Sequence, residues 1–178
     1  FAVYKFLCKK LLSIGDSCSI FAHAYMTISW NLICRAGNTS TICFDHMDWR
    51  EDALCVLFAQ MKNDQLGARP ADPRHLYANP HNPEISCVLA LGIYLLCSDV
   101  PNFELKHLFP GDKQYDRYQK VLKRLYAYPD VADFLTSQSV DPNDLGTHST
   151  RKGAATYVTS GTTAGPGMAA VQIRCGWT

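Results

Sequence analysis

The sequence predicts an α+β fold that is mainly α-helical and contains one small antiparallel β-sheet or hairpin. The chain has 178 residues, of which 47% are hydrophobic, which suffices for one domain with a core but not for two comfortable ones. Most apolar residues recur at the three- and four-residue spacing of helices. Only residues 53–78 combine two short β-type segments with turn residues between them. We therefore expect one domain built mostly from helices.

Two helices are predicted in the first part of the chain. Phe1–Cys18 has apolar residues at helical spacing with lysines on the opposite side. Phe21–Cys34 is a second apolar segment, rich in aromatic residues, and it ends immediately before Arg35. A cation at this position is often only a favourable partner of the helix dipole. A functional role for Arg35 can be inferred only together with residues elsewhere in the chain.

The predicted sheet follows these helices. Phe44–Arg50 is interpreted as a turn leading into a strand at Ala53–Ala59. Asn, Asp and Gly residues within Met61–Gly67 predict a hairpin loop, and Arg74–Ala78 supplies the returning strand. Lys62 lies at the start of this loop, where a lone lysine is usually solvated.

Four more helices are expected before and after the most informative motif. Pro83–Cys97 predicts a buried helix, apolar nearly all round, and Val131–Ser137 and Met168–Arg174 predict short ones. Asp112–Tyr126 predicts a helix with four cations at i, i+4, i+7 and i+11: Lys113, Arg117, Lys120 and Arg124. Such a stripe suits contact with DNA phosphates. The alternative is a solvated face that neighbouring aspartates partly balance.

An H-x-x-R motif carries the clearest chemical signal. His148 and Arg151 lie three residues apart at the start of a predicted helix, with Ser149 or Thr150 as the candidate N-cap. Residues i and i+3 share a helix face, so the two side chains can converge beside the free N–H groups of the first turn, where anions bind. The small residues Gly153–Ala155 indicate that the helix packs closely against a neighbour. The predicted ligand is a phosphate, although such a tetrapeptide also occurs by chance as two surface residues.

Five side chains follow one another in an order found in one family: Arg35, Lys62, His148, Arg151 and Trp177. In this order the chain resembles the catalytic domain of tyrosine recombinases, the phage-integrase superfamily. The residues around each motif are most similar to the eukaryotic Crypton-type members, and the resemblance covers about residues 21–178. It implies a tyrosine-recombinase catalytic-domain-like fold, double-stranded DNA as the partner, self-association on that DNA, and a nuclear location.

The resemblance also implies a role for each residue. Arg35 and Arg151 would grip the scissile phosphate, because two fixed guanidiniums stabilise the charge that the phosphate gains in the transition state. His148 would hydrogen-bond the phosphate or take a proton from the attacking hydroxyl, and Lys62 would protonate the departing 5′ oxygen. Trp177 would donate its indole N–H to a phosphate oxygen, or it is an interfacial residue after a helix-ending glycine.

The chain departs from the family pattern at two points. Asn38 stands three residues after Arg35, where the bacterial and phage members have a Glu that buttresses the site. The nucleophilic Tyr of the family lies beyond the position of Trp177, and Tyr157 points about 240° round its helix from Arg151. We therefore expect residues 1–178 to form a single catalytic-type domain that lacks the N-terminal core-binding domain and the C-terminal tyrosine segment.

Several classes of site are not expected. The eight cysteines contain no C-x-x-C pair and lie mostly in apolar segments, which is typical of reduced core residues in an intracellular protein. No cofactor or metal site is expected, because Asp45, His46 and Asp48 form an ordinary acidic turn. The apolar run Cys87–Cys97 is too short to span a membrane. A net charge of +1 is low for a DNA-binding protein, although basic residues can gather on one face.

The leading interpretation is DNA strand cleavage and rejoining, for recombination or for integration of a mobile element, through a phosphotyrosine intermediate in the full-length protein. The alternative is a non-catalytic DNA-binding or interaction module derived from a mobile element. A third interpretation is a cytosolic helical scaffold with a chance H-x-x-R. The presence of Arg35, Lys62, His148 and Arg151 in one chain favours the first interpretation. A module that only binds DNA has little need of Lys62 and His148.

Overall fold

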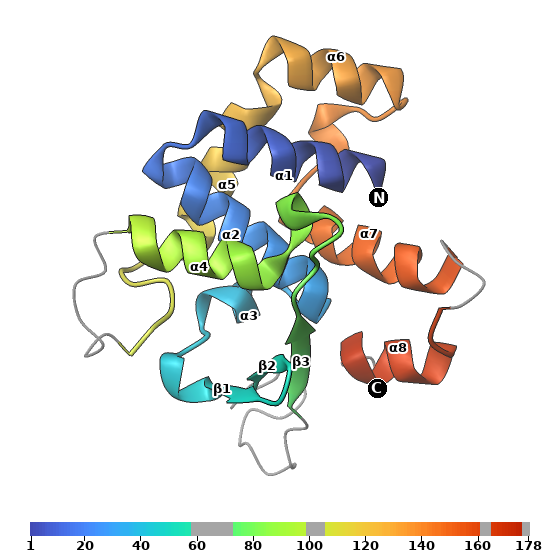
Figure 1. Cartoon of the computed structure of the whole chain (residues 1–178). Helices are drawn as coiled ribbons and strands as arrows, with labels where there is room; N and C mark the ends of the chain where they lie inside the picture. The colour runs from blue at the N-terminus through green and yellow to red at the C-terminus, as the bar shows by residue number, and fades with distance from the viewer. Residues whose placement is uncertain (58–72, 99–105, 161–164, 176–178) are drawn as a thin grey trace.

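The computed structural model describes residues 1–57, 73–98, 106–160 and 165–175, and it is mainly helical with one small sheet (Figure 1). The helices are α1 (Ala2–Ile14), α2 (Ser17–Leu32), α3 (Ala36–Ser40), α4 (Cys87–Cys97), α5 (Gln114–Tyr126), α6 (Pro129–Ser137), α7 (Thr147–Ser160) and α8 (Met168–Cys175). Short 3-10 turns are η1 (Phe44–His46), η2 (Pro83–Ile85) and η3 (Pro142–Asp144). The strands are β1 (Met47–Arg50), β2 (Ala53–Val56) and β3 (Arg74–Tyr77). The predicted fold class is confirmed.

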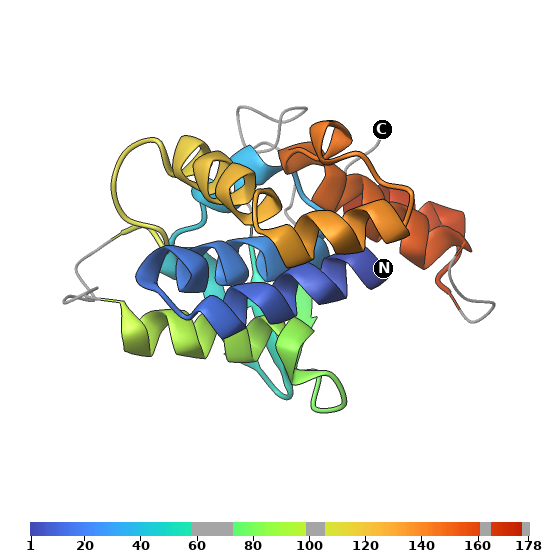
Figure 2. The same ribbon diagram turned by 90° about the horizontal axis from the view of Figure 1, so that it is seen from above.

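Helix α2 forms the centre of the core. It packs against α1, α4, α5 and α7, and its apolar side chains, such as Phe21, Tyr25 and Ile28, are almost fully buried. Viewed from above, α4 lies on one side of α1 and α2, and α5 and α6 lie on the other (Figure 2). A helix covered on every side must be apolar all round, which explains the aromatic-rich sequence of this segment.

The sheet is antiparallel throughout, in the order β1-β2-β3. Residues Trp49, Leu54 and Leu76 are directly paired across the three strands, and Leu54 and Leu76 are buried. The predicted pairing of the 53–59 and 74–78 segments is confirmed. The interpretation of residues 44–50 as only a turn was wrong, because Met47–Arg50 is a largely exposed edge strand held by its pairing with β2. The predicted loop at residues 61–67 lies outside the described residues.

Two predicted helices differ in the structure. The N-terminal one ends at Ile14, because Gly15 adopts a left-handed conformation with φ 69°, and α2 starts directly afterwards. The predicted helix at residues 83–97 is divided into η2 and α4 at Ser86, whose hydroxyl accepts a hydrogen bond from the backbone N–H of Leu89 at 3.4 Å. The expectation of burial all round was wrong. Leu96 is 88% exposed, because α4 lies at the surface and α2 covers only one side of it.

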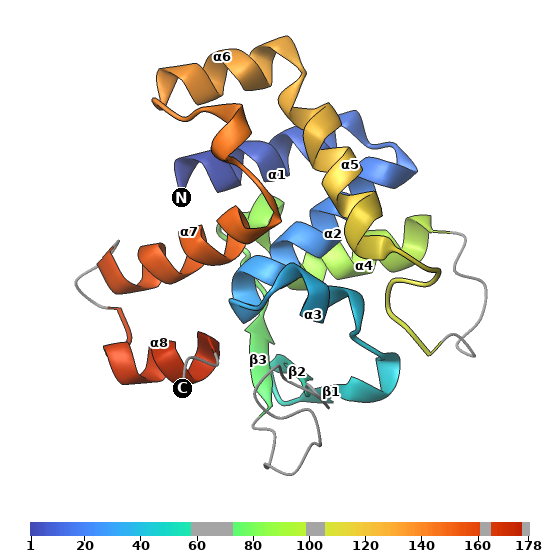
Figure 3. The same ribbon diagram turned by 180° about the vertical axis from the view of Figure 1, so that it is seen from behind.

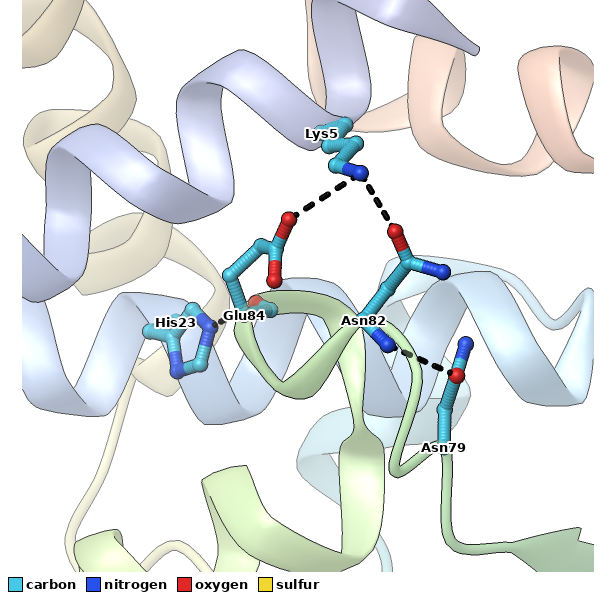
Figure 4. A network of polar contacts seen from close by, with 5 residues as sticks. All are labelled: Lys5, His23, Asn79, Asn82 and Glu84. Carbon is cyan, nitrogen blue, oxygen red and sulfur yellow. Dashed lines mark hydrogen bonds and ion pairs between the residues drawn. The ribbon is translucent and has the colours of Figure 1, made fainter.

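A polar network fixes the segment between β3 and α4 to the first two helices (Figure 4). Lys5 of α1 lies 3.2 Å from the carboxylate of Glu84 and donates a hydrogen bond to the side chain of Asn82. The backbone N–H of Asn82 donates to Oδ1 of Asn79 at 3.0 Å. Nε2 of His23 on α2 donates to the carbonyl oxygen of Glu84 at 2.7 Å. His23 is 1% exposed, and this burial lowers its pKa.

All eight cysteines are free, and six of them are buried: Cys8, Cys34, Cys43, Cys55, Cys87 and Cys175. Burial raises the pKa of the Cys87 thiol to about 11, so this side chain is a neutral apolar group at physiological pH. The predicted location of the cysteines in the core is confirmed at these six positions. None of the helices in the described ranges has the length and apolar content needed to cross a membrane. The same ranges hold no cluster of potential metal ligands.

Candidate phosphate-binding site

Arg35 lies where the chain leaves α2 and enters α3. Ile33 adopts a left-handed conformation with φ 49°, which ends α2 and turns the backbone. Arg35 is then the extended N-cap residue of α3, and its carbonyl oxygen accepts a hydrogen bond from the N–H of Asn38 at 2.8 Å. Its side chain is partly exposed. Within the described residues, no hydrogen bond or ion pair engages the Arg35 guanidinium.

Two further arginines hold the end of α2, and sequence reasoning missed both. Nη1 of Arg74 on β3 donates to the carbonyl oxygen of Leu32 at 2.8 Å. Nη2 of Arg174 on α8 donates to the carbonyl oxygens of Asn31 and His75, both at 2.9 Å. Neither arginine belongs to a sequence motif. The signal that could have indicated them is weak: each is a cation in a short apolar segment predicted to pack against the core.

Helix α7 presents His148 and Arg151. It begins at Thr147, so the predicted N-cap at Ser149 or Thr150 was wrong. The Ser149 hydroxyl instead accepts from the backbone N–H of Gly146 at 3.0 Å, the backward half of a capping box. His148 is the second residue of the helix and is exposed. The predicted location of this pair in the first turns of one helix is confirmed.

The Arg151 guanidinium is oriented by α8 and lies within electrostatic reach of Arg35. Its Nη2 donates a hydrogen bond to the backbone carbonyl oxygen of Cys175, the last residue of α8. Burial lowers the pKa of Arg151, and the positive charge of Arg35 lowers it further. Two like charges that act on one another favour a bound anion, because an anion relieves their mutual repulsion.

Arg35, Arg74, Arg151 and Arg174 form a group that we call the arginine cluster. Figure 3 shows α3, α7, α8 and β3, the elements that contribute it, grouped around the C-terminal end of α2. Burial lowers the pKa of Arg74 and of Arg174. In the part of the chain that the structure describes, no carboxylate forms an ion pair with Arg35 or Arg174. The cluster therefore combines positive charge with hydrogen bonds to backbone carbonyl groups.

The close packing predicted for Gly153–Ala155 is confirmed. Ala154 and Ala155 are buried, and a Cβ atom at Gly153 would lie 3.0 Å from Cζ3 of Trp30 on α2. The Trp30 ring stacks on Tyr4 with ring centroids 3.9 Å apart. A side chain at this position would require the Trp30 ring to shift, so glycine favours the close approach of α7 to α2, and this approach brings Arg151 towards the end of α2.

Tyr115 is a second residue that sequence reasoning missed. Its hydroxyl lies on the first turn of α5 and forms a hydrogen bond of 2.8 Å with the hydroxyl of Thr147, the first residue of α7. Thr147 is 4% exposed. The contact fixes the start of α7 directly beside His148. A tyrosine at the beginning of an amphipathic helix has no sequence signature that would have revealed this role.

The cationic stripe predicted on α5 is partly engaged within the protein. The Arg117 guanidinium lies over the ring of Phe21, 4.0 Å from its centroid. Arg124 lies 3.7 Å from the carboxylate of Asp16. Lys113 and Lys120 are exposed, and no ion pair to the described residues involves them. Two of the four predicted DNA contacts are thus available to a ligand without losing an internal contact.

The cationic stripe and the contact with α7 lie on different sides of α5. Tyr115, which contacts α7, is about 140° to 180° round the helix from Arg117, Lys120 and Arg124. Lys113 is the left-handed N-cap residue that precedes α5, so the predicted helix start at Asp112 was wrong and only Arg117, Lys120 and Arg124 form a stripe on the helix itself.

The remaining predicted site residues have different outcomes. Lys62 and Trp177 lie outside the described residues, so their roles remain predictions. Tyr157 stacks on Phe1 with ring centroids 4.4 Å apart. It also lines a cavity of about 510 Å³ together with Trp30 and Arg174. The expectation that Tyr157 turns away from Arg151 agrees with this contact.

Comparison with known proteins adds one match. No family model and no curated protein matches the chain. Among solved structures, the fold is similar to that of the XerH site-specific recombinase bound to its difH substrate in a pre-cleavage complex, with a TM-score of 0.57 and 16% sequence identity. The match covers 98% of this chain and 44% of the XerH chain, so the chain spans less than half the length of that protein. At this identity the likeness concerns the fold, which is like that of a tyrosine recombinase catalytic domain.

Proposed function

We propose that Arg35 and Arg151 of the arginine cluster bind a phosphodiester of double-stranded DNA, and that the full-length protein cleaves and rejoins DNA strands through a phosphotyrosine intermediate. The observation that carries this proposal is the pair Arg35 and Arg151. Their charges act on one another, and the Arg35 guanidinium has no partner within the described residues. Two guanidiniums whose charges act on one another are suited to bind an anion, because a bound anion relieves their mutual repulsion. The similarity to the XerH recombinase fold supports DNA as that anion.

The proposed chemistry is a phosphoryl transfer without a metal ion. A tyrosine hydroxyl attacks the phosphorus, the bond to the 5′ oxygen breaks, and a 3′-phosphotyrosine bond forms. The exposed imidazole of His148 takes the tyrosine proton or donates to a phosphate oxygen, and Lys62 gives a proton to the departing oxygen. Arg35 and Arg151 stabilise the negative charge on the phosphate oxygens in the transition state. Trp177 donates its indole N–H to one of these oxygens.

The finer assignments rest on the motif order alone. We propose that the protein is a Crypton-type member that acts in the nucleus, integrates or recombines a mobile element, and associates with further copies on its DNA. We also propose that the nucleophile comes from a segment beyond Thr178, because Tyr157 turns to Phe1. A non-catalytic module derived from a mobile element remains the second candidate, which the following experiment separates from the first.

The test is covalent trapping on a nicked suicide substrate, read as a protein–DNA band that survives denaturant. A chain extended through its natural downstream coding sequence should give the band, and its Arg151→Ala variant should not. The 178-residue chain should bind the same duplex without a covalent link. If the extended chain binds the duplex but gives no band, the protein is a non-catalytic DNA-binding module. A band from the 178-residue chain would show that a tyrosine within it serves as nucleophile.

A further inference from the structure

The C-terminal end of α2 has all of its carbonyl groups satisfied, and side chains satisfy half of them. The last four carbonyl groups of any α-helix lack a partner within the helix. In α2, the carbonyl oxygens of Ser29 and Trp30 accept from the backbone N–H groups of Cys34 and Ile33, at 3.3 Å and 3.1 Å. This is the usual solution at a left-handed C-terminus. The carbonyl oxygens of Asn31 and Leu32 receive no such backbone bond. They accept hydrogen bonds from Arg174 and Arg74, respectively.

These two side-chain bonds join distant parts of the chain. Arg74 reaches Leu32 across 42 residues of sequence. Arg174 reaches Asn31 across 143 residues and His75 across 99 residues. The guanidinium of Arg174 therefore joins α8, β3 and α2 at one point. Arginine suits this position because its planar, permanently charged group donates several hydrogen bonds in fixed directions, and because the end of a helix carries partial negative charge.

The bonds act on both members of the predicted phosphate clamp. Arg35 follows Leu32 by three residues, so the position of the last turn of α2 sets where the Arg35 side chain starts. Arg174 directly precedes Cys175, whose carbonyl oxygen receives the hydrogen bond from Arg151. A single side chain thus connects the segment that delivers Arg35 with the carbonyl group that orients Arg151.

We propose that Arg174, supported by Arg74, is a positioning residue that holds Arg35 and Arg151 at the separation a phosphate requires. The proposal rests on the proposed function, in that the clamp must bind a phosphate for the separation to matter. Arg174 itself donates to backbone carbonyl groups, so it acts on the ligand through the other two arginines. Without it, α8 and the end of α2 lose their shared anchor, and the two clamp side chains become mobile relative to one another.

The test uses the side-chain Nε–Hε resonances of Arg35 and Arg151 in the 178-residue chain, recorded with and without inorganic phosphate. In the Arg174→Met variant, which keeps an apolar stem, both resonances should shift or broaden. Phosphate affinity, read from the same resonances, should fall about tenfold to a hundredfold, by analogy with metal sites, where losing a group that orients the ligands weakens binding by this factor. Arg174→Lys should recover part of the affinity, since an ammonium group can still donate to one or two of the carbonyl oxygens.

Arg50→Met is the matched control, because Arg50 is exposed on the edge strand and pairs with Asp48. It removes the same charge and should change neither resonance. Unchanged Arg35 and Arg151 resonances in a folded Arg174→Met or Arg174→Lys variant would overturn the positioning role. If the resonances move in Arg174→Met but the wild-type chain does not bind phosphate, the coupling stands and the proposed function fails. If Arg174→Met does not fold, the Arg174→Lys variant decides, with weaker phosphate binding as the expected result.

Discussion

The guanidinium of Arg151 donates to the backbone carbonyl of Cys175, so the arginine of the H-x-x-R motif is oriented by the last residue of α8. This bond determines how the motif can act. The bond engages one edge of the guanidinium, so the position of the Arg151 side chain depends on α8. Helix α8 is in turn anchored to α2 and β3 through Arg174. A motif that looks local in the sequence therefore depends on three elements from other parts of the chain.

The first prediction concerns Arg151 in the extended, tyrosine-containing protein. Arg151→Ala should lower the rate of strand cleavage on the order of a hundredfold or more, because losing one preorganised donor to a developing charge commonly has this effect. Duplex binding should change little, since most of its affinity comes from contacts to phosphates elsewhere. Single-turnover cleavage and a gel-shift titration measure the two quantities. Equal losses of cleavage and binding would contradict a role that is specific to the transition state.

The second prediction separates the two halves of the α5 stripe. A variant with Lys113→Ala and Lys120→Ala should bind DNA more weakly and reduce the slope of log affinity against log salt by about two, because each phosphate contact contributes about 0.9 to that slope. Its thermal stability should not change, since both side chains are exposed. An unchanged salt slope would show that the two lysines are only solvated.

The third prediction is the complement of the second. Arg117→Ala should lower the free energy of unfolding by about 1 kcal/mol, because its guanidinium lies over the ring of Phe21 and such contacts contribute about that much. It should change the salt slope of DNA binding less than the two lysine changes do. Chemical denaturation and the same salt titration provide the comparison. A full loss of one phosphate contact with unchanged stability would mean that Arg117 leaves Phe21 to bind DNA.

Much of the fold and part of the site were predictable because they depend on local patterns. Helical spacing placed His148 and Arg151 on one helix, and the small residues after them correctly indicated a close neighbour, which is Trp30. Arg35 was identifiable only as part of an ordered set. The cationic spacing on α5 was also visible, but periodicity alone does not tell which cations reach Phe21 or Asp16.

The rest depends on contacts that leave no trace in the sequence. Arg74 and Arg174 bind backbone carbonyl groups of α2, and every residue has such a group, so no pattern identifies the partner. The exposed apolar residue Leu96 shows the opposite case. Hydrophobicity indicates that a helix is suited to burial, but how many of its sides are covered depends on where the neighbouring helices lie.

The fourth prediction concerns the buried His23. In the folded protein burial lowers its pKa below 6.5, whereas the unfolded chain keeps the ordinary value of about 6.5. The unfolded state therefore binds more protons as the pH falls below about 6.5, and folding stability must decrease in that range. Replacing His23 with Gln, whose amide can still donate to the Glu84 carbonyl, should reduce this dependence. Urea midpoints measured between about pH 7.5 and pH 5 test it, because most carboxylates titrate below that range.

His148→Gln is the matched control for this measurement, because it also replaces one histidine, but the side chain that it replaces is exposed and lies outside the buried network. The comparison of slopes cancels the contribution of the remaining histidines. Identical slopes for the wild type and His23→Gln would mean that His23 is accessible to protons in the folded state, and that the network in Figure 4 opens more readily than its geometry indicates.

The last prediction compares two glycines in helix interiors. Gly92→Ala should raise the free energy of unfolding by about 0.5 to 1 kcal/mol, because alanine loses less backbone entropy than glycine on folding and nothing lies within 4 Å of the new methyl group. Gly153→Ala has the same intrinsic advantage, but its methyl group would lie 3.0 Å from Cζ3 of Trp30. The Trp30 ring can yield only by disturbing its stack on Tyr4. Gly153→Ala should therefore be no more stable than the wild type, and α7 should shift with Arg151. Equal stabilisation by both substitutions, with the Arg151 Nε–Hε resonance unchanged, would contradict this prediction. It would show that a methyl group fits between α7 and Trp30 without moving either.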